Sequence, residues 1–174
     1  SFPQGLVFVG ERGTREAISR IVAHPFTVPL EDLPYPVEFI ELEGSSPSLP
    51  FELEWRPMVH ADPCLGYRIN HRNKSLAFCT DTGPCPEALE LAKNADLLVT
   101  ECSYLPGETA EAWPHLNPES AARIALDSGA RRLVLTHFDA TRYPDQASRK
   151  LAETSARSIF PETVSSHDGL VIDI

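Results

Sequence analysis

The chain has 174 residues, 42% of them hydrophobic, which is enough to bury a core, and we expect one domain over residues 1–174. Lysine and arginine total 15 against 25 acidic residues, and the formal net charge of −10 argues against a nucleic-acid partner. A small anionic substrate remains compatible with this charge, because bound metal cations bring positive charge of their own.

The first half of the chain is expected to be rich in strands. Residues 6–9 form a short apolar run that is typical of a buried strand, and a helix is expected from Thr14 to about Ala23. Residues 37–42 alternate between apolar and polar side chains, which predicts a strand with one solvent-exposed face. Further strands are expected at 51–59, 65–70 and 75–80, with a hairpin turn at 71–74.

The second half alternates between helices and strands. Helices are expected at 86–95, 117–128 and 144–159, and strands at 97–101, 132–136 and 169–174. Asn117 followed by Pro118 is a typical helix start, and Gly129 a typical helix end. Residues 103–116 form a long irregular segment, which in a compact domain is often functional. The alternation predicts an α/β layered domain with helices on the sheet.

The four cysteines form no C-x-x-C pair, which argues against a structural zinc knuckle. They are Cys64, Cys79, Cys85 and Cys102. We expect these cysteines to be small buried residues with free thiols. Free thiols are typical of a reducing compartment, so a cytoplasmic location is predicted. No apolar run approaches the length of about 18 residues that a membrane span needs.

Four apolar runs each end in an acidic or histidine side chain. These side chains are His60, Asp81, Glu101 and His137. The end of a strand is rigid while the following loop is open to solvent, so such residues can face a shared concavity. Two imidazoles and a carboxylate form a ligand set suited to zinc, iron or manganese, although one histidine after a strand is more often an ordinary surface or core residue.

His115 lies in the irregular segment, and Glu101 ends the strand just before that segment. A carboxylate beside a histidine fixes its tautomer and prepares it to donate a proton, but sequence alone favours an ordinary loop histidine beside an unrelated carboxylate. Arg142 and Tyr143 are candidates for contact with an anionic substrate, with a solvated helix start as the commoner explanation. The other histidines, His24, His71 and His167, are predicted at the surface.

These residues occur in a characteristic order. The series is His60 with Gly66-Tyr67-Arg68-Ile69, Thr80-Asp81-Thr82-Gly83, Thr100-Glu101, His115, Leu135-Thr136-His137-Phe138, Arg142-Tyr143 and Asp168-Gly169-Leu170. Over nearly the whole chain, this series resembles the second half of the metallo-β-lactamase fold, in particular its ribonuclease Z-like phosphodiesterase branch. The resemblance implies the C-terminal portion of an αββα sandwich.

The resemblance also implies roles for five residues. His60 would bind the first of two divalent metal ions, His137 the second, and Asp81 would bridge them. Zinc is the expected metal, with manganese and iron as alternatives. His115, supported by Glu101, would protonate the leaving oxygen. A metal-bound hydroxide would attack phosphorus, because a metal lowers the pKa of its bound water to about 7.

The sequence departs from the family pattern in two ways. It has no H-x-H-x-D-H motif, which belongs to the half of the fold that would precede Ser1, so we expect the site to be completed by a missing N-terminal half or by another chain. Only 21 residues separate His60 from Asp81, which leaves no room for the arm with which ribonuclease Z grips tRNA.

The predicted activity is therefore hydrolysis of a small phosphodiester or cyclic phosphate. Hydrolysis of an ester, lactone or thioester in the same fold is one alternative. A metal-free binding or assembly module is another. A half-sandwich would expose an apolar sheet face, so pairing into a homo-oligomer is also expected.

Overall fold

The computed structural model describes residues 4–43, 47–110 and 112–174. The chain divides into two compact units, Ser1–Leu49 and Pro50–Ile174, which are described in turn. The expectation of one domain over residues 1–174 stays a prediction. Within the described residues, no helix is long and apolar enough to cross a bilayer.

The first unit is a two-stranded parallel sheet with one helix. Strand β1 (Leu6–Gly10) pairs with β2 (Val37–Glu41), and between them come helix α1 (Thr14–Ile21) and the short 3-10 helix η1 (Leu30–Asp32). Phe8 and Phe39 lie opposite each other in the ladder and stack with ring centroids 5.1 Å apart. Glu41 accepts hydrogen bonds from the backbone N–H groups of Gly13 and Arg15, which fixes the start of the helix.

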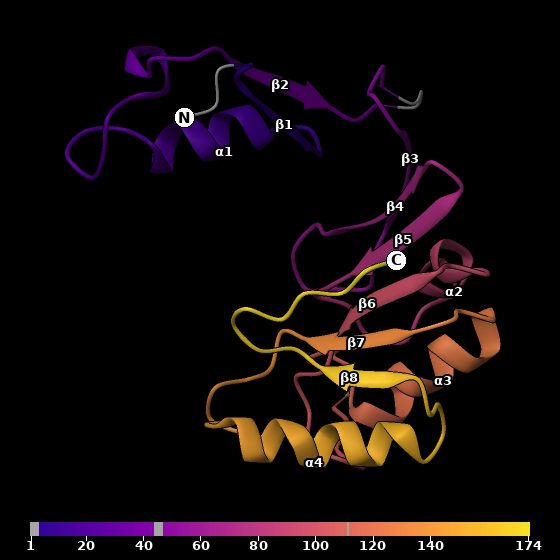
Figure 1. Ribbon diagram of the computed structural model, residues 1–174. Coiled ribbons are helices and arrows are strands. Elements are labelled where there is room, and N and C mark those ends of the chain that lie inside the picture. Colours follow the sequence, from indigo (N-terminus) through magenta and orange to yellow (C-terminus); the bar gives the residue numbers. More distant parts are fainter. Residues whose placement is uncertain (1–3, 44–46, 111) are drawn as a thin grey trace. The chain divides into compact units, whose positions relative to one another are not determined.

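The second unit is a six-stranded sheet with three helices along one side (Figure 1). Its elements in chain order are β3 (Glu52–Pro57), β4 (Leu65–His71), β5 (Lys74–Cys79), α2 (Pro86–Ala92), β6 (Leu97–Glu101), α3 (Pro118–Ser128), β7 (Leu133–Thr136), α4 (Gln146–Arg157) and β8 (Thr163–Ser165). The strands lie in the order β3-β4-β5-β6-β7-β8, antiparallel from β3 to β5 and parallel from β5 to β8. This confirms the expected helices on a sheet.

Local sequence explains the sharpest boundaries of this unit. Arg72 and Asn73 have φ of 48° and 63°, the left-handed pair that a two-residue hairpin between β4 and β5 requires. The Asn117 side chain accepts a hydrogen bond from the backbone N–H of Ser120 at 2.8 Å, which confirms the expected cap of α3. Gly129, with φ of 70°, ends that helix as predicted.

The core lies between the sheet and the helices. Its fully buried side chains include Leu98, Leu133 and Leu135 from the central strands, and alanines line the facing sides of the helices. Small alanine side chains let α2 and α3 approach the sheet closely. This packing makes the central strands a rigid base for the residues at their ends.

The predicted strand at 169–174 is wrong. In the structure these residues form no strand, and the last strand of the sheet is β8. Leu170-Val171-Ile172 have high strand propensity, but a strand also needs a ladder partner, and β8 occupies the place beside β7. The segment is instead held by a hydrogen bond from the Arg132 guanidinium to the backbone carbonyl of Asp173.

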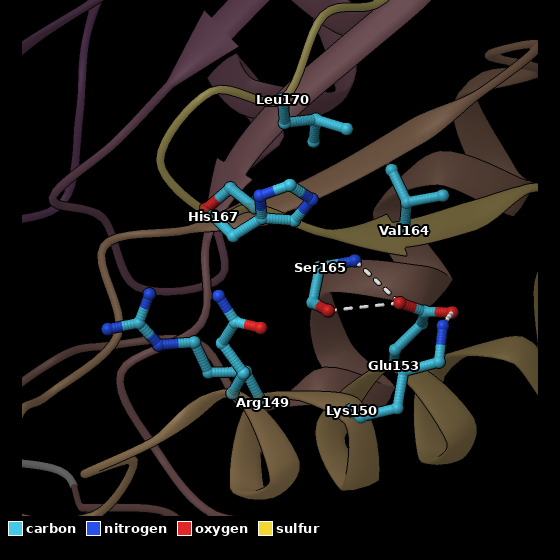
Figure 2. A pocket seen from close by; sticks show the side chains of 9 residues that line it. Arg149, Lys150, Glu153, Val164, Ser165, His167 and Leu170 are labelled. Carbon is cyan, nitrogen blue, oxygen red and sulfur yellow. Dashed lines mark hydrogen bonds and ion pairs between the residues drawn. The ribbon is translucent and has the colours of Figure 1, made fainter.

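Glu153 ties α4 to β8, as Figure 2 shows. Its side chain is only 3% exposed, and one carboxylate oxygen accepts hydrogen bonds from the backbone N–H and the hydroxyl of Ser165, both 2.9 Å long. Lys150 and Arg157 pair with the other oxygen. Burial by itself raises the pKa of Glu153, but the hydrogen bonds from Lys150 and Ser165 outweigh it, so the pKa lies below its ordinary value.

We expect Glu153→Gln to lower the free energy of unfolding at pH 7 by about 1–3 kcal/mol, because the half-buried Ser165 donors lose a charged acceptor. A lowered folded-state pKa means that the carboxylate stabilises the fold fully above the unfolded-state value of about 4.3 and loses this effect as the pH falls further. The difference in urea stability between wild type and variant should therefore shrink on acidification. The exposed Glu162→Gln is the control, and an equal difference at pH 7 and about pH 3 would contradict the assignment.

Candidate metal centre

The sheet topology brings the predicted residues to one edge. Strands β5, β6 and β7 are parallel neighbours, so their carboxyl ends coincide, and there lie Asp81, Glu101 and His137. Strand β3 runs in the same direction, because two antiparallel pairings relate it to β5. The backbone N–H of Gly83 donates to the Val59 carbonyl at 2.8 Å, which holds the segment before His60 beside the segment after β5.

Asp81 lies between two histidines. Its Oδ1 is 3.1 Å from His137 Nε2 and 3.8 Å from His60 Nε2. The Asp81 and His137 side chains are 37% and 43% exposed, so this group is open to solvent on one side. The structure thus brings together the three residues that sequence analysis picked out as metal ligands, and their role in metal binding stays a prediction.

Ser103 determines which nitrogen of His137 can bind a cation. Its hydroxyl donates to the His137 carbonyl oxygen at 3.0 Å, so at 3.1 Å from Nδ1 it accepts a hydrogen bond from the ring. The proton is then on Nδ1, and the Nε2 lone pair faces the Asp81 carboxylate. A cation between these two atoms, either a proton or a metal ion, would hold them together, and the imidazole and carboxylate donors fit a metal ion. Sequence reasoning missed Ser103, whose partner is 34 residues away.

The backbone at two of these positions is unusual. Asp81 has φ of 52° and His137 φ of 50°, in the left-handed region that side chains other than glycine seldom adopt. Aspartate and histidine tolerate this region better than branched residues do. Such strain persists only where the surroundings enforce it, and it is concentrated at functional sites. Here it turns both side chains back over the sheet edge toward each other.

Glu101 and His115 form a buried pair beside the Asp81 group. The His115 Nδ1 lies 2.8 Å and 3.0 Å from the two Glu101 oxygens, and the two side chains are 8% and 0% exposed. The carboxylate also accepts hydrogen bonds from the backbone N–H groups of Thr82 and Leu116, at 2.6 Å and 3.1 Å. Glu101 therefore fixes the His115 ring and joins the end of β5 to the irregular segment.

The potential ligand atoms of Asp81, Glu101, His115 and His137 all lie within 4.8 Å of one another. Glu101 is the member least suited to bind a metal, because its two oxygens already accept hydrogen bonds from three groups in a fully buried position. The His115 ring lies 6.0 Å from the rings of both His60 and His137, measured between centroids. The arrangement is thus an open group of metal-type donors with one oriented imidazole beside it.

Gly83 allows the segment that carries His115 to lie close to the end of β5. A Cβ at residue 83 would lie 2.7 Å from the Pro114 Cβ, which is too short for two carbon atoms. Because Pro114 directly precedes His115, the missing side chain lets the irregular segment pack against the end of β5.

Arg142 and Tyr143 hold the irregular segment from its other side. The Arg142 guanidinium donates to both Glu108 oxygens, at 2.6–3.1 Å, and pairs with Asp139 at 3.1 Å. The Glu108 hydrogen bond raises the pKa of Arg142 and lowers that of Glu108. Tyr143 is buried and donates to the Tyr104 carbonyl at 2.6 Å. Both candidate substrate contacts are therefore engaged within the protein.

Cys79, Cys85 and Cys102 are buried, and Cys64 is half-buried. Burial raises the pKa of Cys79 and of Cys102 to about 12, which disfavours the thiolate form. Cys64 donates to the Thr80 carbonyl. The prediction of small buried residues is confirmed for three of the four cysteines and not for Cys64.

Comparison with known proteins places this geometry in a family. Residues 6–138 match the beta-lactamase superfamily domain. Ribonuclease Z of Gemmatimonas aurantiaca is 38% identical over 127 residues, which cover 72% of this chain and 39% of that protein. Ribonuclease Z of Acaryochloris marina is 40% identical over 101 residues, which cover 56% of this chain and 32% of that protein. The chain spans about a third of the length of the curated relatives that it matches.

Comparison with solved structures supports the same family. The metallo-beta-lactamase fold protein YhfI of Bacillus subtilis superposes with a TM-score of 0.76 at 20% identity, covering 95% of this chain and 64% of that chain. This likeness confirms the predicted αββα fold class. The chain therefore belongs to the metallo-β-lactamase superfamily, with relatives named ribonuclease Z.

Proposed function

We propose that the full-length protein is a metal-dependent hydrolase that cleaves a phosphodiester. The observation that carries this proposal is the convergence of His60 and His137 on Asp81, with His115 held beside them by Glu101. Relatives of this chain are named ribonuclease Z, which supports a hydrolase.

The metal would be held by His60 Nε2, the Asp81 carboxylate and His137 Nε2. A divalent ion there supplies activated water and neutralises charge on phosphate oxygens. Three protein donors are too few to complete two zinc sites of four ligands each, so we expect further ligands from outside the described residues. Zinc as the metal and two ions as the number are predictions.

His115 would serve as the proton donor. Glu101 binds Nδ1, which leaves Nε2 as the nitrogen that can carry a proton to the leaving oxygen. The buried carboxylate holds the ring in one orientation, so the proton is delivered at a fixed position. Tyr104, whose ring packs edge-on to His115 with centroids 5.6 Å apart, limits rotation of the ring.

The test is a substrate panel on the full-length protein. Bis-p-nitrophenyl phosphate, cyclic phosphates and a short RNA should be compared with lactones and thioesters. RNA belongs in the panel because relatives carry the name ribonuclease Z, although the net charge of −10 argues for a small substrate. We expect phosphodiester cleavage that is lost with a chelator and regained on adding Zn²⁺ or Mn²⁺. Cleavage of lactones alone, or activity indifferent to chelation, would contradict the proposal.

A further inference from the structure

A polar pocket opens beside His137, next to the proposed metal centre. It has a volume of about 370 Å³, and its lining includes His137, Arg149, Ser166, His167 and Asp168. The lining comes from the end of β7, the first turn of α4 and the turn after β8. His167 is exposed, as predicted, and here it faces a pocket that it shares with a proposed metal ligand.

Arg149 is the unusual member of this lining. Its Nε is buried and has no hydrogen-bond partner among the described residues. The guanidinium instead lies over the Phe138 ring, 5.4 Å from the centroid. Figure 2 shows the Arg149 side chain directed away from Glu153 and Lys150. A half-buried guanidinium without acceptors is costly, because each buried donor has lost its water.

Other half-buried arginines of this unit have acceptors. Arg68 donates to backbone carbonyls at 2.7 Å and 2.8 Å, and Arg56 pairs with Glu90 at 3.3 Å. Arg142 is paired with Glu108 and Asp139. Stacking on Phe138 fixes the plane of the Arg149 guanidinium, and because Nε is buried, the two terminal nitrogens are the donors that a ligand in the pocket can reach. A guanidinium with a fixed plane is suited to bind phosphate.

Building on the proposed function, we propose that Arg149 binds a phosphate group of the substrate other than the one that is cleaved. The pocket joins His137 to Arg149, so a ligand at the metal centre can reach both. Its lining of charged and hydroxyl groups suits a phosphate and its sugar rather than an apolar group. The substrate class is then a phosphodiester that carries a second phosphate next to the scissile one.

Asp168 provides the rival explanation. It lines the same pocket, so Arg149 could serve only to balance that carboxylate. The two explanations differ in what they predict for the wild type: if Arg149 only balances Asp168, wild type and Arg149→Gln should bind phosphate equally. Removing the carboxylate should leave phosphate binding unchanged or tighter if Arg149 binds phosphate, because a neighbouring negative charge is lost.

The first test measures binding of inorganic phosphate to the full-length protein by calorimetry in the presence of EDTA. Arg149→Gln should weaken binding about 10- to 100-fold, the effect of losing charge-assisted hydrogen bonds. Arg149→Lys should give a smaller loss, because lysine keeps the positive charge but lacks the paired N–H donors of the guanidinium. The exposed Arg123→Gln is the matched control and should bind like wild type. Equal binding by wild type and Arg149→Gln, an equal loss in Arg123→Gln or Asp168→Asn, or no binding by wild type would each overturn the proposal.

The second test separates this inference from the proposed function. Two dinucleotides are compared that differ only in an additional terminal phosphate. Arg149→Gln should raise KM about 10-fold or more for the longer substrate, with kcat and the shorter substrate unaffected. An equal change for both substrates would overturn the phosphate role. If wild type cleaves neither, the proposed function fails, while the phosphate titration still decides the role of Arg149.

Discussion

Asp81→Asn in the full-length protein is expected to abolish bound metal and turnover together. The substitution removes the carboxylate charge that faces both His60 and His137 but keeps a side chain of the same shape. Asparagine also tolerates φ of 52°, so the backbone is not newly strained, whereas Asp81→Ala combines loss of the ligand with strain. Turnover should fall by more than about 10²-fold, a loss that even a 1 Å displacement of reacting groups can cause.

Metal content by plasma mass spectrometry and initial rates on a phosphodiester are measured on the same samples. Asp62→Asn is the matched control, because Asp62 is an exposed acid whose backbone, not its carboxylate, contacts His60. Retained metal and retained activity in Asp81→Asn would remove Asp81 from the centre.

His115→Ala is expected to lower kcat by about 10²–10⁴-fold while the metals stay bound, the effect of losing a general acid. The loss should depend on the leaving group. A nucleoside alkoxide must be protonated as it departs, whereas p-nitrophenolate leaves readily without a proton. We therefore expect a large defect on a dinucleotide and a small one on bis-p-nitrophenyl phosphate.

His71→Ala is the control for this variant, since His71 is an exposed residue at the end of β4. Glu101→Gln should reproduce part of the defect, because it weakens the acceptor that orients the His115 ring. Loss of metal in His115→Ala would make His115 a ligand rather than a proton donor. Equal defects on both substrates would exclude leaving-group protonation.

Much of the second unit could be predicted from the sequence. Apolar runs that stop at Asp81, Glu101 and His137 are local patterns, and so are the Asn117 cap and the hairpin at Arg72 and Asn73. Their meeting at one edge follows from parallel pairing, which alternating helices and strands favour. The resemblance to a known family added the roles, which composition and spacing could not supply.

Other features depend on contacts between distant residues. The tie from Ser103 to His137 and the pair of Arg142 with Glu108 each join residues 34 positions apart, and nothing local marks the partner. The strand predicted at 169–174 failed for the same reason, because propensity does not reveal which strand will pair with β7. The orphaned Arg149 donor likewise becomes visible only when its surroundings are known.

Anomalous X-ray scattering at the metal absorption edge, from a crystal of the full-length protein, tests the central claim most directly. We expect a peak about 2.0–2.2 Å from the Nε2 atoms of His60 or His137 and from a carboxylate oxygen of Asp81, the bond lengths of zinc to such ligands. Peaks elsewhere, or a metal-loaded crystal with none at these three side chains, would contradict the assignment of the centre.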